Sequence, residues 1–338
     1  MIKNKKKTFI VAEVGMSHHG NIGIAHSLID TFSKTGVDAI KFQTHYADYE
    51  STKYEKFRNK KLSFYKTRYN YWKKTEFSQN EWKKLLIHCN KKNVKFLSSP
   101  FSVHAAKILD IIGMNTWKIA SGEITNFELL DFVRKTKKPV ILSSGMSFIS
   151  ELEDAYFYLK KYTKDISILQ CTSIYPSSPK DIGLNLMEQI NNKYKCKFGL
   201  SDHSGEIYPS LAAVSLGASI IEVHATISKE DFGPDTSSSL DISQLNDLVK
   251  GVRFIDEILN NPLDKNKKTK SLKDMKKLFE KSLFINKKLK KDHKITKKDL
   301  DIKKPGIGIK PNKINKVLNK KLKKDYNKDE ILQLKDLK

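Results

Sequence analysis

Eight short apolar runs, rich in β-branched residues, recur between residues 9 and 226, and a helical pattern follows most of them. The runs occupy residues 9–15, 39–44, 95–100, 116–121, 139–144, 167–173, 197–203 and 219–226. Repeated strand-then-helix units favour parallel strands joined by crossovers, and eight of them close naturally into a barrel. We therefore predict an α/β fold of the (β/α)8 TIM-barrel type. An open doubly wound sheet is the alternative, disfavoured because no G-x-G-x-x-G motif follows the first run.

The barrel pattern ends well before the C-terminus of this 338-residue chain. We assign residues 1–262 to the barrel and residues 263–281 to a polar, lysine-dense linker with helical potential. Residues 282–338 show short strand and turn patterns, which predict a small second domain. Residues 45–80 form a long connection after the second run, rich in Tyr and Lys, and such connections often act as lids.

The composition is that of a globular protein, because 39% hydrophobic residues can fill a sizeable core. No apolar run approaches the roughly 18 residues of a membrane span, and Glu13 interrupts the only stretch that resembles a secretory signal. Cys89, Cys171 and Cys196 lack C-x-x-C spacing, which predicts packed, reduced thiols. We expect a cytoplasmic protein with no membrane partner.

The net charge of +25 suggests nucleic-acid binding. From Asp264 onward the chain holds 27 lysines and 10 acidic residues, a net +17. Only four of the 63 basic residues are arginines, namely Arg58, Arg68, Arg134 and Arg253, and none lies in this basic region. Because Arg is favoured for bidentate phosphate and base recognition, we expect a solvated lysine-rich surface and no nucleic-acid partner. A nucleic-acid-binding protein on an inactive barrel is the distant alternative.

Polar and charged residues gather at or near the C-terminal end of each run. They are Glu13, Lys41, Gln43, Ser99, Lys118, Ser121, Ser143, Ser173, Ser201, His203 and His224. Taken singly, a serine after a strand is usually a helix N-cap, and a strand histidine is more often a hydrogen-bonded core residue. In a barrel, however, these ends converge on the face that carries the active sites of barrel enzymes. The set therefore predicts a shared pocket.

Two kinds of chemistry follow from this set. His203 and His224, on neighbouring strands, can hold a divalent metal through two imidazoles, leaving positions for water and substrate. Lys41 and Lys118, with several serine hydroxyls, suit a phosphate or a carboxylate. Glu123, just beyond the fourth run, can supply a carboxylate for proton transfer. The alternative role for Lys118 is that of a Schiff-base nucleophile, as in barrel aldolases.

Motifs at these positions resemble the motif series of the sialic acid synthase family. They are AEVGMSHHG (12–20), KFQTH (41–45), FLSSPFS (96–102), WKIASGEITN (117–126), ILSSGM (141–146), LQCTSIYP (169–176), GLSDHSG (199–205), EVHAT (222–226) and FGPDTSSSL (232–240). In the tail, KSLFINKKL and KKPGIGI resemble the antifreeze-like (SAF, β-clip) domain that closes those enzymes. The resemblance covers essentially the whole chain.

The resemblance implies an N-acetylneuraminate synthase-like transferase that condenses phosphoenolpyruvate with the open-chain aldehyde of an N-acylated amino sugar. In that family a Mn²⁺ or Mg²⁺ ion, here held by His203 and His224, orients and polarises the aldehyde. C3 of phosphoenolpyruvate attacks the aldehyde, water adds at C2, and phosphate leaves by C–O cleavage. The product is a nonulosonic acid of the sialic acid type.

The family's contacts transfer to this chain by position. The expected phosphoenolpyruvate contacts are Lys41, Ser99, Lys118, Ser121, Ser143 and Ser201. The groups expected to meet the metal, water or sugar are Glu13, Gln43, Glu123, Tyr175 and Asp235. Ser173 stands where bacterial N-acetylneuraminate synthases often have a sugar-contacting Asn. Glu13, Glu123 and Lys118 are the expected catalytic residues.

The resemblance also implies a homodimer in which the small domain is exchanged, so that its central turn reaches the partner's site. Here Lys304 precedes Pro305 and Gly306, where well-known members carry Arg, and a lysine cannot form the same bidentate fork. N-acetylmannosamine is the preferred acceptor. The alternatives are a di-N-acylated 6-deoxy sugar, which would make the enzyme a legionaminate or pseudaminate synthase, and a phosphorylated aldose.

Overall fold

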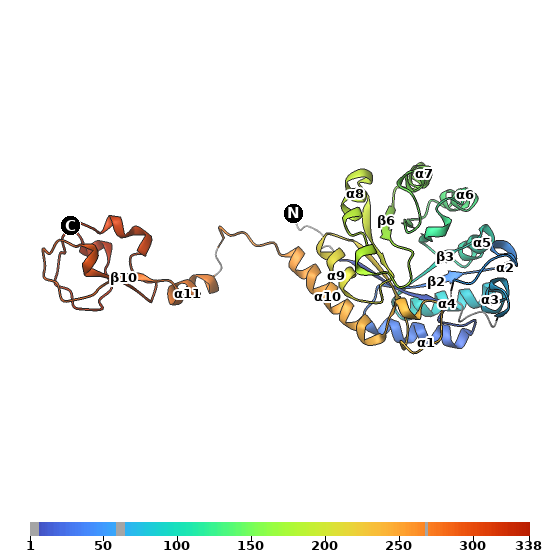
Figure 1. Ribbon diagram of the computed structural model, residues 1–338, viewed down its shortest axis with the longest axis horizontal. Coiled ribbons are helices and arrows are strands. Elements are labelled where there is room, and N and C mark those ends of the chain that lie inside the picture. The colour runs from blue at the N-terminus through green and yellow to red at the C-terminus, as the bar shows by residue number, and fades with distance from the viewer. Residues whose placement is uncertain (1–6, 59–64, 268–269) are drawn as a thin grey trace. The chain divides into compact units, whose positions relative to one another are not determined.

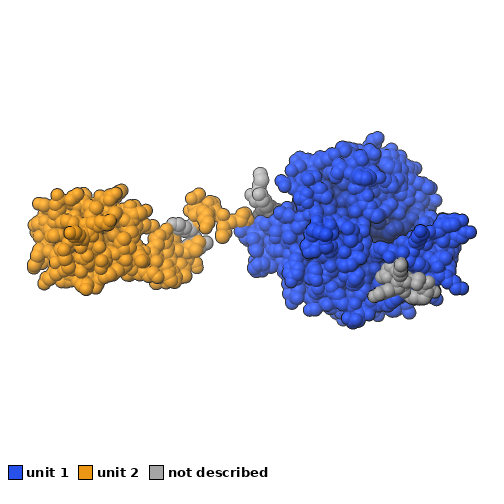
Figure 2. Space-filling model, in the orientation of Figure 1, with its two compact units in different colours: residues 1–261 blue, residues 262–338 orange. Residues whose placement is uncertain are grey.

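A computed structural model describes residues 7–58, 65–267 and 270–338 (Figure 1). The chain divides into two compact units, residues 1–261 and 262–338, which Figure 2 colours separately. The first unit carries all eight strand-and-helix repeats. The predicted linker, residues 263–281, belongs to the second unit and contains the helix α11 (Lys270–Phe279).

The first unit is built on eight parallel strands, as predicted. They are β1 (Phe9–Gly15), β2 (Ala39–Thr44), β3 (Lys95–Pro100), β4 (Trp117–Ile119), β5 (Val140–Ser143), β6 (Ile166–Cys171), β7 (Lys197–Asp202) and β8 (Ile220–Ala225). Their hydrogen-bonded order is β3-β2-β1-β8-β7-β6-β5-β4, and β3 and β4 at its two ends contact each other. The sheet is thus a nearly closed barrel, which confirms the TIM-barrel prediction and excludes an open doubly wound sheet.

A helix follows every barrel strand and packs against the outside of the sheet (Figure 1). These helices are α1 (Ile22–Phe32), α4 (Gln79–Lys91), α5 (Val103–Ile111), α6 (Phe127–Lys135), α7 (Ile149–Lys160), α8 (Asn185–Tyr194), α9 (Tyr208–Ser215) and α10 (Ile242–Asn260). Local sequence sets several of their starts. Ser78 and Glu81 form a capping box at α4, and Asp241 and Gln244 form one at α10.

Burial on both faces explains why the strands are such continuous apolar runs. Outward side chains, such as Ile10 on β1 and Ile40 on β2, pack with the helices in the main core of the unit. Inward side chains form a separate small cluster inside the barrel, which contains Val11, Leu97 and Ile220. The inner cluster closes the lower part of the barrel beneath the C-terminal ends of the strands.

The long connection between β2 and α4 has structure of its own. It contains α2 (Ala47–Glu50) and α3 (Arg68–Thr75), and part of it, residues 59–64, lies outside the described residues. Tyr71 and Trp72 of α3 are buried with Met16, which follows β1. The connection therefore packs onto the C-terminal rim of the barrel. A short strand, β9 (Ser239–Leu240), pairs with β8 at the same rim.

The second unit has a separate hydrophobic core. The antiparallel strands β10 (Ser282–Ile285) and β11 (Leu300–Lys303) pair, and Leu283, Ile295 and Leu322 are fully buried among other apolar residues of the unit. In the described parts of both units, no helix combines the length and apolar character needed to span a membrane.

Candidate active site

The candidate site is produced by the period-two alternation of the barrel strands. Along β8, Ile220 belongs to the inner apolar cluster, and Glu222 and His224 follow two and four residues later on the same face. Along β2, Ala39 is followed in the same way by Lys41. Apolar side chains therefore fill the lower barrel, and polar side chains line a pocket of about 500 Å³ at the C-terminal ends of the strands.

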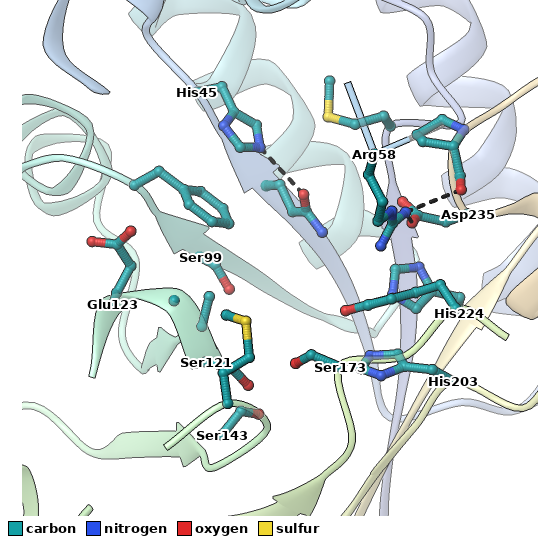
Figure 3. Close-up of a pocket in the computed structure, with 18 of the residues that line it drawn as sticks. His45, Arg58, Ser99, Ser121, Glu123, Ser143, Ser173, His203, His224 and Asp235 are labelled. Carbon is teal, nitrogen blue, oxygen red and sulfur yellow. Dashed lines mark hydrogen bonds and ion pairs between the residues drawn. The ribbon is translucent and has the colours of Figure 1, made fainter. Parts of the chain in front are cut away.

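The pocket brings together nearly all of the residues selected from the sequence. Its lining includes Lys41, Gln43, Ser99, Lys118, Ser121, Glu123, Ser143, Ser173, Tyr175, Ser201, His203, His224 and Asp235. Glu13 lies beside this lining, because it pairs with Lys41 and accepts a hydrogen bond from the Gln43 amide at 3.0 Å. Ser99, Ser121 and Ser143 form one wall, and His203, His224 and Asp235 lie across from them (Figure 3).

Two buried lysines face two buried carboxylates in this pocket. Lys41 forms an ion pair with Glu13, and the Glu222 Oε1 atom lies 3.5 Å from Lys41 Nζ and 3.6 Å from Lys118 Nζ. Burial opposes ionisation of Glu222, but the attraction of Lys118 and Lys41 outweighs it and lowers the Glu222 pKa to about 2. Burial likewise opposes the charge on Lys41, yet the two carboxylates raise its pKa. For Lys118, burial dominates and lowers the pKa.

The serines at the strand ends face the pocket and do not cap helices. Lys118 Nζ donates to Ser143 Oγ at 2.7 Å, and Lys41 Nζ lies 3.4 Å from Ser99 Oγ. The helix after β3 is capped instead by Ser102. Lysine and hydroxyl donors therefore alternate on this wall, which suits the oxygens of a carboxylate or phosphate.

A tight turn after β5 places two further serines. The Gly145 backbone N–H donates to Ser121 Oγ at 2.9 Å, and a Cβ added at Gly145 would lie 2.3 Å from Ser173 Oγ and 2.6 Å from Ser121 Oγ. Both contacts are shorter than real Cβ atoms tolerate. The two hydroxyls can approach this turn only because residue 145 is a glycine.

The two histidines lie side by side on the paired strands β7 and β8. The ring centroids of His203 and His224 are 5.3 Å apart, and the rings are tilted by 50°. His203 Nδ1 lies 2.8 Å from the Thr172 carbonyl oxygen, so Nδ1 carries the proton and Nε2 keeps its lone pair. Burial lowers the pKa of His224, whereas the Cys171 sulfur outweighs burial and raises that of His203.

This histidine pair fits a divalent metal as two of its ligands. The ring nitrogen of a metal-binding histidine that does not bind the metal usually donates to a carboxylate, a backbone carbonyl or water, and His203 Nδ1 donates to the Thr172 carbonyl oxygen here. Among residues 7–58, 65–267 and 270–338, no three His, Cys, Asp or Glu side chains are arranged to hold an ion by themselves. An ion at the two imidazoles would therefore leave positions for water and substrate.

Tyr175 and Asp235 cover the histidine side of the pocket. The Tyr175 ring lies 4.1 Å from the His203 ring and 6.0 Å from the His224 ring, measured between centroids. Burial opposes ionisation of Asp235, but His224 and Arg58 outweigh it and lower the Asp235 pKa. Arg58 lies at this wall, 2.5 Å from Asp235 Oδ1 (Figure 3).

A further hydrogen-bonded histidine lies beside Gln43. His45 Nδ1 is 2.6 Å from Glu50 Oε1. His45 Nε2 is 3.2 Å from Gln43 Oε1, and this contact is the dashed line drawn from His45 in Figure 3. The His45 ring is stacked between Trp72 and Phe101, at 3.9 Å and 4.2 Å between centroids. Because the Gln43 amide nitrogen donates to Glu13, this histidine fixes which way the amide points.

Glu123 and Lys304 complete the set of sequence-selected residues. Burial raises the pKa of Glu123, and its Oε2 accepts a hydrogen bond from Asn126 at 2.8 Å. Lys304 belongs to the second unit, where its ammonium lies 5.1 Å from the centre of the Phe279 ring. Thirteen predicted residues thus line the pocket, Glu13 lies beside it, and Lys304 lies in the other unit.

Sequence reasoning missed several residues of the pocket: His45, Glu50, Arg58, Cys171 and Glu222. The alternation along β8 was a usable signal for Glu222, since it lies two residues before His224. His45 follows Gln43 by the same spacing. Arg58 and Glu50 had no such signal, because they lie in the connection after β2 and reach the pocket through tertiary structure alone.

Comparisons with known proteins agree with this architecture. The NeuB family model matches residues 28–263, and the SAF domain model matches residues 280–338. The chain is 34% identical over 334 residues to the N,N'-diacetyllegionaminic acid synthase of Campylobacter jejuni, covering 97% of this chain and 99% of that protein. It is 32% identical over 270 residues to the N-acetylneuraminate-9-phosphate synthase of Mus musculus, covering 77% and 74%.

The fold of this chain is also similar to that of a solved structure. The N-acetylneuraminic acid synthetase of Leptospira borgpetersenii, in complex with citrate, aligns with a TM-score of 0.70 at 33% identity, covering 81% of this chain and 92% of that one. The expected C-terminal antifreeze-like domain is confirmed by the SAF match. With a barrel matched over most of its length and relatives of this identity, the chain belongs to the NeuB family of sialic acid synthases.

Proposed function

We propose that this NeuB family enzyme condenses phosphoenolpyruvate with the open-chain aldehyde of an N-acylated amino sugar, giving a nonulosonic acid and phosphate. One observation carries the proposal. A single pocket holds two lysines and several serine hydroxyls together with two imidazoles and Asp235, and Figure 3 shows serines across from the imidazoles. Such a pocket can hold a small anion against a second, polar and uncharged substrate.

The lysine wall is assigned to phosphoenolpyruvate. Lys118 with Ser143, and Lys41 with Ser99, offer paired donors to carboxylate and phosphate oxygens. Burial lowers the pKa of Lys118, which would suit a Schiff-base lysine. Lys118 nevertheless donates to Ser143 and lies beside Glu222, and we take these contacts to favour ionic binding. Trapping of substrate on Lys118 by borohydride would reverse this assignment.

The opposite wall is assigned to the acceptor sugar. His203 and His224 would hold Mn²⁺ or Mg²⁺, which supplies Lewis acidity toward the aldehyde oxygen when bound. Tyr175 and Asp235 offer an aromatic face and a carboxylate to the sugar. C3 of phosphoenolpyruvate bonds to the aldehyde carbon, the aldehyde oxygen takes up a proton, water adds at C2, and the C2–O bond to phosphate breaks.

The carboxyl groups of Glu123 and Glu13 are assigned different roles. Burial raises the pKa of Glu123, which brings it closer to the range of a useful acid or base. Glu13 holds the Gln43 amide and Lys41 in place, so it supports the reacting groups. We assign Glu123 to proton exchange with water or the aldehyde oxygen, and Glu13 to orientation of its neighbours.

The relatives favour the di-N-acylated 6-deoxy acceptor over the N-acetylmannosamine preferred from sequence. The legionaminic acid synthase of Campylobacter jejuni aligns along 97% of this chain, whereas the neuraminate-9-phosphate synthase aligns along 77%. Ser173, in place of the Asn frequent in N-acetylneuraminate synthases, also agrees with a different sugar. We further propose a homodimer with exchanged SAF domains, as the resemblance implies.

An acceptor panel tests the proposed function. The protein is incubated with phosphoenolpyruvate, Mn²⁺ and, in turn, N-acetylmannosamine, its 6-phosphate and di-N-acetylated 6-deoxy sugars. We expect phosphate release with the last class, and phosphoenolpyruvate labelled with ¹⁸O at its bridging oxygen should deliver that label to phosphate. No phosphate from any acceptor would refute the proposal, and label retained in the sugar acid would refute C–O cleavage.

A further inference from the structure

Arginine is scarce in this chain, so its positions are informative. Only four of the 63 basic residues are arginines. Two of them, Arg58 and Arg68, lie in the connection between β2 and α4, and both line the candidate active site. A lysine supplies the same charge, so an arginine is required only where a planar, multiply donating group is needed.

Arg58 makes the contacts that such a group allows. Its guanidinium carbon lies 3.9 Å from the centre of the Tyr175 ring. Its Nη2 donates to Asp235 Oδ1 at 2.5 Å and to the Pro234 carbonyl oxygen at 3.0 Å. Both hydrogen bonds leave from one nitrogen, so the rest of the guanidinium is free to lie over the Tyr175 ring. A lysine ammonium could donate to the same oxygens, but it has no planar group to place over the ring at the same time.

The two side chains that Arg58 holds are those that cover the histidine pair. The Tyr175 ring is 4.1 Å from the His203 ring. Asp235 is buried, and its Oδ2 lies 3.2 Å from where a Cβ on Gly15 would stand, close to His224. A buried carboxylate is costly without a partner, so Arg58 also stabilises the ionised form of Asp235.

Arg58 is supported by well-packed neighbours in the same connection. Arg68 Nε lies 3.2 Å from Glu55 Oε1, and its guanidinium carbon lies 5.0 Å from the Trp72 ring centre. The Trp72 indole N–H donates to Glu55 Oε2 at 3.0 Å. These contacts tie the stretch before Arg58 to α3 and so to the rim of the barrel.

We propose that Arg58 is a positioning and specificity residue for the acceptor, holding Tyr175 and Asp235 in the geometry that binds the amino sugar. This inference rests on the proposed function. Arg58 lies in the connection between β2 and α4, so this connection would contribute to the acceptor site in addition to the residues at the strand ends. Among the described residues, no hydrogen bond or ion pair joins Arg58 to Lys118 or Ser143, the residues assigned to phosphoenolpyruvate.

The test compares Arg58→Lys with Arg134→Lys in the full-length protein. Arg134 is a matched control on the outer helix α6, since it pairs with Asp131 and stacks on Tyr158 at 4.2 Å. We expect Arg58→Lys to raise the KM for the acceptor roughly 10-fold while the KM for phosphoenolpyruvate stays within about 2-fold. Arg134→Lys should change neither constant.

Chemical rescue distinguishes positioning from a general structural role. Activity lost in Arg58→Ala should return in part on addition of guanidinium below unfolding concentrations, and activity of Arg134→Ala should not respond. Equal rises in both KM values, or an unchanged acceptor KM, would overturn the proposal for Arg58. If the wild type turns over no acceptor, the proposed function fails first and this inference fails with it, so the two failures are distinguished by the wild-type assay.

Discussion

At the residue scale, both lysines of the pocket are already paired with carboxylates before any ligand enters. Lys41 and Lys118 are matched by Glu13 and Glu222, and the nearby Asp235 is matched by Arg58. A dianion such as phosphoenolpyruvate would therefore add uncompensated negative charge to a buried site, which is costly. Two neutral imidazoles with a divalent ion would supply the missing positive charge. Binding of the anion and binding of the metal should thus be coupled.

This coupling can be measured with His203→Ala and a matched control, His88→Ala. His88 lies on the outer helix α4, where its Nδ1 is 2.8 Å from His26 Nδ1. By calorimetry, we expect Mn²⁺ to strengthen phosphoenolpyruvate binding about 10-fold in the wild type and in His88→Ala, because it adds charge within a few ångströms of the anion. His203→Ala should lose this enhancement together with turnover.

The calorimetry can also contradict the assignment of the metal to His203 and His224. If His203→Ala keeps the Mn²⁺-dependent gain in phosphoenolpyruvate affinity, the metal does not bind at the histidine pair. Loss of the gain in His88→Ala as well would indicate a general structural effect in place of a local one.

At the scale of elements, the barrel depends on close contact between neighbouring strands. Gly199 of β7 pairs with Ile220 of β8, and a Cβ added at Gly199 would lie 1.9 Å from the Ile220 carbonyl oxygen. Because that oxygen belongs to the backbone, it cannot move aside as a flexible side chain could. A glycine is therefore required at position 199 for β7 to pair closely with β8. This pairing in turn places His203 beside His224.

We expect Gly199→Ala to destabilise the protein by about 2–4 kcal/mol, because the added methyl group must push the two strands apart. Urea unfolding followed by circular dichroism measures the change. Gly122→Ala is the control, since its nearest atom would be Met146 Cε at 3.5 Å, an ordinary contact. Equal unfolding midpoints for the two variants would show that β7 and β8 adapt without cost.

At the scale of the whole molecule, the chain carries two hydrophobic cores in two units. The core of residues 262–338 includes Leu283, Ile295 and Leu322, all fully buried within that unit. Many of its lysines are paired with acidic residues, such as Lys290 with Asp325 at 2.8 Å. These pairs are individually weak, and they leave a net charge of +17 because 27 lysines stand against only 10 acidic residues.

We expect a fragment of residues 262–338 to fold on its own, with one cooperative thermal transition, because its core is internal to the unit. We also expect it to bind duplex DNA only at low salt, since lysines without bidentate or stacking contacts give non-specific binding that salt releases. Fluorescence anisotropy across a salt series tests this. Tight binding at physiological salt would favour the nucleic-acid alternative, and a non-cooperative transition would argue against an independent unit.

Much of this protein follows from local pattern. The eight apolar runs coincide with the eight barrel strands to within a few residues, because buried parallel strands must be continuously apolar and their crossovers amphipathic. Alternation along each strand also places residues such as Lys41 and His224 on the inner face, so their convergence could be anticipated once a barrel was inferred. For the same reason, the resemblance of the strand-end motifs to those of the sialic acid synthase family was enough to predict most residues of the pocket.

The tertiary structure determined the positions of residues that the periodicity of the strands and helices does not predict. Arg58 and Asp235 are 177 residues apart, and nothing in the spacing around either predicts their ion pair. The position of Glu50 also depends on how the β2–α4 connection packs on the rim of the barrel. Irregular connections are placed by packing and by partners distant in sequence, whereas strands are placed by a repeating pattern. The sequence by itself thus determined the barrel and most of the polar residues of its pocket, whereas only the tertiary structure placed Arg58 and Glu50 among them, because both lie in an irregular connection.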